Sequence, residues 1–153
     1  VPGDSDVTAE RCAALLAELL AAWPDGRIKL YLTWRLLQLR RARAETFASG
    51  GYRPLRLDAP DPDAVVAFAR DDVVVAVPRL VRARLEPGGL SVNAEGRVFT
   101  GMPRRTLRNV LDGREVVADA DGAIALATAF ATLPVAVLTA ADASGEATSA
   151  GNV

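Results

Sequence analysis

The stretch LLQLRRARAETFASGGYRPL, residues 36–55, contains the point at which this sequence changes from helical to extended patterning. Its first half continues a segment whose spacing of apolar residues predicts a helix over about residues 26–48. Gly50 and Gly51 then form a strong helix stop, because glycine readily adopts the left-handed backbone that closes many helices. From Tyr52 onward, short runs rich in β-branched residues predict strands. The junction therefore predicts an α+β chain, with two N-terminal helices followed by an antiparallel β-sandwich.

The first of these helices precedes Pro24. Proline ends it because proline lacks a backbone N–H and disfavours helical backbone at Trp23. Since Cys12 lies on the apolar face of this helix, we interpret it as a core residue rather than a reactive one. The apolar positions follow the i, i+3, i+4, i+7 spacing of an amphipathic helix; they are Cys12, Leu15, Leu16, Leu19, Leu20 and Trp23.

The second helix is apolar on nearly every side. A helix of this kind is normally buried on more than one face. In a chain of 153 residues it predicts a helix held between two bodies, one of which is missing. We expect the isolated chain to associate through Ile28–Leu39. The apolar residues are Ile28, Leu30, Tyr31, Leu32, Trp34, Leu36, Leu37 and Leu39.

Three arginines, Arg40, Arg41 and Arg43, follow in the last turns of this helix. They could bind phosphate. We favour the alternative, a solvated end whose positive charges complement the negative end of the helix dipole.

After Gly51 the sequence predicts six to eight short strands with polar turns between them. Asp71–Asp72 and Asp112–Gly113 are typical of tight hairpin turns. The run Val73–Val75 predicts a strand that is buried on both faces or lies at the centre of a sheet. A long loop or weak hairpin is expected over residues 86–105, and a disordered tail over 142–153. The expected strands are Tyr52–Leu57, Ala64–Arg70, Val73–Leu80, Leu107–Leu111, Arg114–Val117 and Pro134–Ala140.

Composition excludes several classes of function. The 18 lysines and arginines nearly balance the 19 aspartates and glutamates, so no bulk charge attracts nucleic acid or a membrane surface. The chain has no histidine, and Cys12 is its only cysteine, so we expect no nucleophile–base pair, metal site or cofactor. The Asp71–Asp72 pair is interpreted as turn chemistry, because adjacent carboxylates at a strand end point apart. A single cysteine also fits the reducing cytoplasm.

The run from Gly122 to Ala141 carries no charged residue over twenty positions, which is long enough to cross a bilayer. Pro134 interrupts it, however, and no basic residue follows to anchor a cytoplasmic end. We therefore predict a short helix followed by the buried strand Pro134–Ala140.

Several motifs resemble a known family. Leu36–Phe47 followed by Gly50–Leu55 is similar to the last barrel helix and first sandwich strand of α-amylase-type enzymes, with Ala44 where proline is common. Five further runs, in family order, resemble maltooligosyl trehalose synthases: DGRIKLYLT (25–33), VVAFAR (65–70), VAVPRL (75–80), LRNVLDGR (107–114) and LPVAVL (133–138). The chain departs from the family at Leu107, usually tryptophan, and Asp112, usually threonine.

The resemblance implies a glycoside hydrolase family 13 enzyme, a (1→4)-α-D-glucan 1-α-D-glucosylmutase. Such an isomerase converts the reducing-end α-1,4 bond of a maltooligosaccharide into an α,α-1,1 bond by a retaining double displacement. Its two catalytic carboxylates lie on the strands of a (β/α)₈ barrel, and no residue here matches them. We therefore expect an inactive C-terminal segment that binds the α-1,4-glucan only through the absent barrel.

The same resemblance implies that residues 1–49 are the last helices of that missing catalytic barrel, that 50–141 are the C-terminal sandwich, and that 142–153 are the tail. Lys29 either contacts substrate or, as we favour, binds a carboxylate of the absent barrel. Two alternatives remain open: a non-catalytic carbohydrate-binding β-sandwich, or the C-terminal domain of another α-amylase-type hydrolase or transglucosylase.

Overall fold

The computed structural model describes residues 9–79 and 95–141. Within these ranges the chain forms four α-helices: α1 (Ala9–Ala21), α2 (Arg27–Ala42), α3 (Ala44–Ala48) and α4 (Leu126–Ala129). Its 3₁₀ turns are η1 (Trp23–Asp25) and η2 (Pro62–Ala64). The strands are β1 (Tyr52–Pro54), β2 (Leu57–Asp58), β3 (Val65–Arg70), β4 (Val73–Pro78), β5 (Arg97–Phe99), β6 (Thr106–Asn109), β7 (Glu115–Val117), β8 (Ala123–Ala125) and β9 (Ala136–Ala140).

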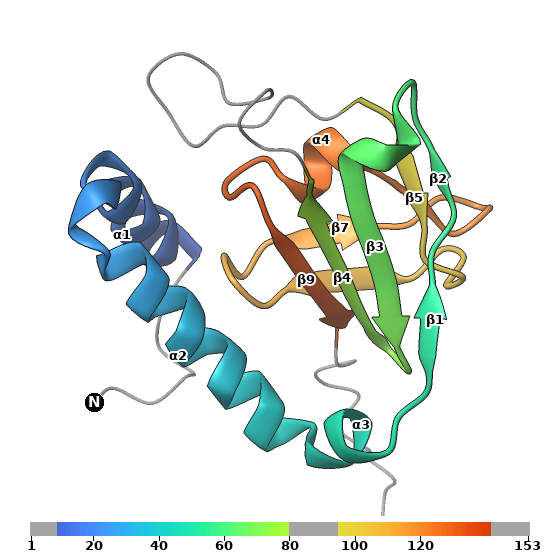
Figure 1. Ribbon diagram of the computed structural model, residues 1–153, viewed down its shortest axis with the longest axis horizontal. Helices are drawn as coiled ribbons and strands as arrows, with labels where there is room; N and C mark the ends of the chain where they lie inside the picture. The colour runs from blue at the N-terminus through green and yellow to red at the C-terminus, as the bar shows by residue number, and fades with distance from the viewer. Residues whose placement is uncertain (1–8, 80–94, 142–153) are drawn as a thin grey trace, which may run out of the picture.

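These strands form two antiparallel sheets. The larger has the order β1-β3-β4-β9-β6-β7, and the smaller has the order β2-β5-β8. Figure 1 shows α1 and α2 on one side of the larger sheet and the strands β2 and β5 on the other. The predicted α+β class, with helices before an antiparallel sandwich, is confirmed.

The strand β4 lies at the centre of the larger sheet, between β3 and β9. Its side chains alternate between two apolar clusters: Val73 and Val75 pack on the helix side, and Val74 and Ala76 pack between the sheets. Alternation to opposite faces is the normal geometry of a strand. The prediction that Val73–Val75 is buried on both faces is therefore confirmed.

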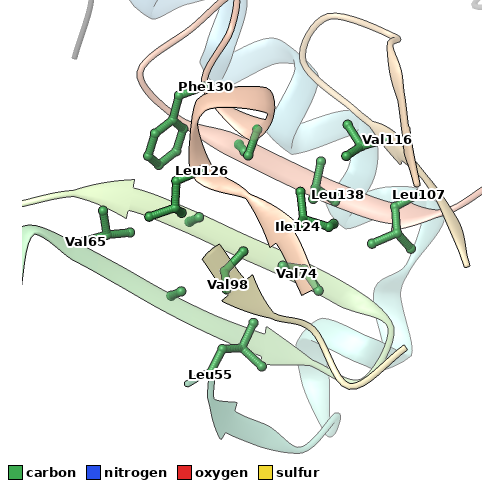
Figure 2. Close-up of a cluster of buried hydrophobic side chains, with 14 of the residues drawn as sticks. Leu55, Val65, Val74, Val98, Leu107, Val116, Ile124, Leu126, Phe130 and Leu138 are labelled. Carbon is green, nitrogen blue, oxygen red and sulfur yellow. The ribbon is translucent and has the colours of Figure 1, made fainter. Parts of the chain in front are cut away.

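The core between the sheets draws on both of them and on α4. Figure 2 shows Val65 and Val74 of the larger sheet facing Val98 and Ile124 of the smaller, with Phe130 above them. Val74 and Val98 have no exposed surface at all. This shared core makes the two sheets a sandwich.

A second core joins the helices to the larger sheet. Leu16 of α1 and Ile28 of α2 pack in one cluster with Val73 and Val137 of the sheet. Cys12 is partly buried against the same cluster, which confirms its interpretation as a core residue.

The prediction of one continuous helix over residues 26–48 is wrong. The helix divides at Arg43 into α2 and the short α3, because Arg43 adopts φ −122° and ψ 44°, outside the helical region. The Arg43 guanidinium binds the Asp72 carboxylate across 2.7 Å. The bend therefore brings the helix end to the β3–β4 turn.

The predicted strand Tyr52–Leu57 also divides. Its first part, β1, pairs with β3 in the larger sheet, and its continuation, β2, pairs with β5 in the smaller one. Leu55, between them, is buried in the core that the sheets share. The chain thus crosses from one sheet to the other at this residue.

The described residues contain nine strands, one more than the predicted maximum of eight. The expected loop over residues 86–105 contains β5, while its part over 86–94 lies outside the described residues, as does the expected tail 142–153. The uncharged run Gly122–Ala141 forms β8, α4 and β9, so the predicted short helix and buried strand are confirmed. No helix in the described part of the chain is long and apolar enough to span a membrane.

Candidate functional site

The candidate site is the face of α2 that points away from the sheet. Ile28 and Leu39 lie on the inner face and are buried. Leu30, Trp34 and Leu37 are spaced by four and three positions, so they line the opposite side of a helix with about 3.6 residues per turn. Their exposed fractions are 71%, 41% and 54%. The prediction that α2 is apolar on most sides is thus confirmed, and its outward side is exposed in this chain.

An open depression of about 450 Å³ lies over the C-terminal half of this face. Trp34 and Leu37 form its apolar wall, and Arg40 and Arg41 form its charged end. The remaining lining residues are Gln38 and Ala44. The centroid of the Trp34 ring lies 6.3 Å from that of the Tyr31 ring and 5.6 Å from the Arg35 guanidinium.

Three cations accompany the apolar stripe. Lys29, Arg40 and Arg41 are exposed, and none of them makes an ion pair with any residue in 9–79 or 95–141. The helix sequence RIKLYLTWRLLQLRRA contains no acidic residue that could neutralise them. Lys29, the only lysine of the chain, lies in the first turns of α2 rather than in the depression.

Arg43, the third arginine of the predicted cationic end, has a different role. It is half-buried and paired with Asp72, so it joins α2 to the sheet instead of binding phosphate. Asp71 and Asp72 form the β3–β4 turn, as predicted. The Asp71 carboxylate accepts a hydrogen bond from the Gly51 N–H at 3.0 Å, which ties the turn to the segment after α3.

A polar latch connects α2 to the β6–β7 turn. The Tyr31 hydroxyl donates to the Leu111 carbonyl oxygen at 2.6 Å. Arg35, one helical turn later, donates from Nε and Nη2 to the Val110 carbonyl oxygen at 2.9 and 2.6 Å. Two runs that carry the family resemblance, residues 25–33 and 107–114, therefore contact each other directly.

Burial of the Tyr31 hydroxyl raises its pKa, and its contact with the Cys12 sulfur at 3.5 Å raises it further. Desolvation disfavours the negatively charged phenolate. Tyr31 is therefore a neutral structural donor at ordinary pH. Sequence patterns did not indicate this latch, because its acceptors are backbone carbonyls, which any sequence provides.

Acidic side chains of the described residues take part in turns, caps and ion pairs. The described residues contain no group of three or more histidines, cysteines or acidic residues placed to hold a metal ion. Two carboxyl groups, Asp25 and Asp119, have lowered pKa values, caused first by backbone N–H donors of Arg27 and Ala123. A glycosidase acid requires the opposite shift. Asp112 is buried but paired with Arg114 at 3.0 Å.

Comparison with known proteins gives one kind of match. Neither a protein-family model nor a curated protein matches the chain. Among solved structures, maltooligosyltrehalose synthase from Arthrobacter ramosus matches with 28% sequence identity and a TM-score of 0.54 over 85% of this chain. A mutant of that enzyme matches with 27% identity and a TM-score of 0.55 over 92%. The resemblance inferred from the sequence motifs is confirmed.

The match covers only 16% and 17% of those two chains. The 153 residues thus span about a sixth of the length of the enzymes that they resemble.

Proposed function

We propose that this chain is the C-terminal segment of an enzyme with maltooligosyl trehalose synthase activity. The observation that carries the proposal is the structural match over 85% of the chain at 28% identity. The contact between residues 25–33 and 107–114 supports it, because two separate family-like motifs form one interface. The parent enzyme would be a cytoplasmic isomerase of glycoside hydrolase family 13.

The proposed reaction rearranges the reducing-end α-1,4 bond of a maltooligosaccharide into an α,α-1,1 bond. It needs a carboxylate nucleophile and a carboxylic acid/base on opposite sides of the scissile bond. Nothing in the described residues supplies such a pair. We therefore assign the chemistry and the glucan site to a barrel outside this chain, and we assign this segment a structural role.

In this proposal residues 1–49 complete the barrel and residues 50–141 form the sandwich that covers it. The exposed stripe of α2 supports this assignment, because a contiguous exposed apolar patch commonly marks a surface that contacts another part of a protein. Lys29 binds a carboxylate of the barrel rather than glucan.

The test is an assay of the complete reading frame that encodes this segment, with maltopentaose as substrate. We expect loss of reducing ends and formation of a product that ends in trehalose. New reducing ends would instead indicate an α-amylase-type hydrolase, and unchanged substrate would contradict the proposal.

One observation favours the alternative of a carbohydrate-binding sandwich. Tyr52, 62% exposed on the edge strand β1, packs against Phe68 with ring centroids 5.2 Å apart. Aromatic rings on a sheet can stack on sugar rings. Retardation of the 153-residue chain in a gel containing amylose, abolished by Tyr52→Ala, would support this alternative.

A further inference from the structure

We propose that the outward face of α2 binds an apolar surface of the parent enzyme that is bordered by acidic side chains. This inference rests on the proposed function and deepens it by naming the chemistry of the partner surface. The face consists of Leu30, Trp34 and Leu37 together with the cations Lys29, Arg40 and Arg41.

The apolar part requires a cover. Leu30, Trp34 and Leu37 form a continuous stripe, and burying apolar surface is the main favourable contribution to protein association. The depression beside Trp34 and Leu37 is open, so a side chain of the partner can enter it. Trp34 already packs beside Tyr31 and Arg35, and contacts made before docking reduce the side-chain entropy that docking costs.

The charges decide which partner fits. Lys29 and Arg40 are eleven positions apart, about three helical turns, so both lie along the same side of the stripe. Arg41 stands at its C-terminal end. Three cations without acidic neighbours on the helix select a partner that supplies carboxylates, because charges at an interface are arranged to be complementary.

The same charges disfavour a second copy of this chain. When two α2 helices pair through this face in antiparallel orientation, Lys29 of one copy approaches Arg40 and Arg41 of the other. Parallel pairing brings like residues together. Both arrangements set cation against cation, since Arg27–Ala42 contains no aspartate or glutamate. The partner that the charges fit is therefore a different surface, and the remaining five-sixths of the matched enzymes is where the proposed function locates it.

Lys29 provides a direct test, because it is the only lysine of the chain. A carbodiimide activates a carboxylate, and an amine then displaces the urea to form an amide without a spacer, so the bond reports amines and carboxylates that lie in contact. The full-length enzyme is treated with carbodiimide and digested, and the peptide that contains Lys29 is identified by mass spectrometry. We expect an isopeptide bond from Lys29 to an aspartate or glutamate outside residues 1–153. The isolated 153-residue chain and Lys29→Arg in the full-length enzyme are the controls.

Each outcome decides a separate point. A bond from Lys29 to a carboxylate of a second copy of this segment, or an unmodified Lys29 in an enzyme that is active on maltopentaose, overturns the docking inference and leaves the proposed function intact. A full-length product without that activity overturns the proposed function, whatever Lys29 binds.

Tryptophan fluorescence gives a second measurement of the same inference. In the full-length enzyme, Trp34 is expected to be shielded from acrylamide. Trp34→Phe should therefore leave the intensity that acrylamide can quench unchanged, because the substitution removes a shielded fluorophore. Trp23, 50% exposed and outside the stripe, is the matched position, and Trp23→Phe should decrease the quenchable signal. Equal accessibility of both tryptophans would contradict docking through this face.

Discussion

At the scale of single residues, Gly50 shows a constraint that a helix stop alone does not require. A side chain at Gly50 would collide with the Thr46 carbonyl oxygen and with the Asp71 carboxylate, whereas one at Gly51 would meet its nearest atom at an ordinary 3.7 Å. The close approach exists because Asp71 accepts a hydrogen bond from the Gly51 N–H. Gly50 therefore permits the contact between the helix end and the β3–β4 turn.

We expect Gly50→Ala to lower the free energy of unfolding by about 1–3 kcal/mol, the range for overpacking of a tight site. Gly51→Ala is the matched control and should cost well under half as much. Urea unfolding followed by circular dichroism measures both. Equal losses would show that the collision at Gly50 is relieved by movement of Asp71.

The Tyr31 hydroxyl is a second residue with an effect that can be measured. Tyr31→Phe leaves the carbonyl oxygen of buried Leu111 with only the weak Cys12 thiol donor at 3.9 Å, which should cost about 1–3 kcal/mol of stability. Tyr52→Phe is the control, because Tyr52 is exposed and its hydroxyl makes no hydrogen bond within the described residues. Chemical denaturation of the two variants at neutral pH distinguishes them.

The same hydroxyl predicts a pH dependence. Its pKa is higher in the folded chain than in the unfolded one, so its contribution is complete below the unfolded pKa of about 10 and is lost as pH rises toward the folded pKa. The stability difference between the native chain and Tyr31→Phe should therefore stay constant up to about pH 10 and shrink as pH rises above that value. A constant difference above that pH would mean that Tyr31 is solvated.

At the scale of elements, β4 is the central strand of the fold, because it contributes side chains to both cores. We expect Val74→Ala to cost roughly 2 kcal/mol, since it removes fully buried methyl groups from the core between the sheets. Val66→Ala on β3 is the control, because Val66 is 37% exposed and should cost less than half as much. Thermal unfolding of both variants tests this difference, and similar losses would contradict a core centred on β4.

Most elements were predictable where local chemistry and tertiary structure agree. The β3–β4 hairpin follows from its valines and the Asp71–Asp72 turn, and α1 follows from its single apolar face. The strands β5 and β8 were not predicted. Each has three residues, and β5 lies in a glycine-rich region whose pattern is polar, so its strand is stabilised by pairing with β2 and β8. Such pairing is not encoded in the local sequence.

The candidate site was predictable in part for the same reason. The surplus of apolar residues on α2 indicated an uncovered face, which the structure locates at Leu30, Trp34 and Leu37. The sequence did not separate Arg43 from Arg40 and Arg41. That separation depends on the break in the helix and on Asp72, which is 29 positions away.

At the scale of the whole molecule, the structure limits which side of Ile28–Leu39 can mediate the expected association of the chain. Ile28 and Leu39 are buried, so association must use the outward stripe and bring its cations together. We expect a monomer at low ionic strength and increasing association in salt, because screening weakens the repulsion. Size-exclusion chromatography with light scattering measures this. Association that decreases with salt would contradict the arrangement of charges.

The central proposal is that these 153 residues are a structural segment whose chemistry lies elsewhere in a maltooligosyl trehalose synthase-like enzyme. The most direct measurement is incubation of the purified 153-residue chain with maltopentaose, with reducing ends followed over time beside the full-length enzyme at equal molar concentration. We expect no turnover by the segment and steady loss of reducing ends with the full-length enzyme. Turnover by the segment itself would contradict the account, because catalytic carboxylates would then have to lie among residues assigned here to turns and ion pairs.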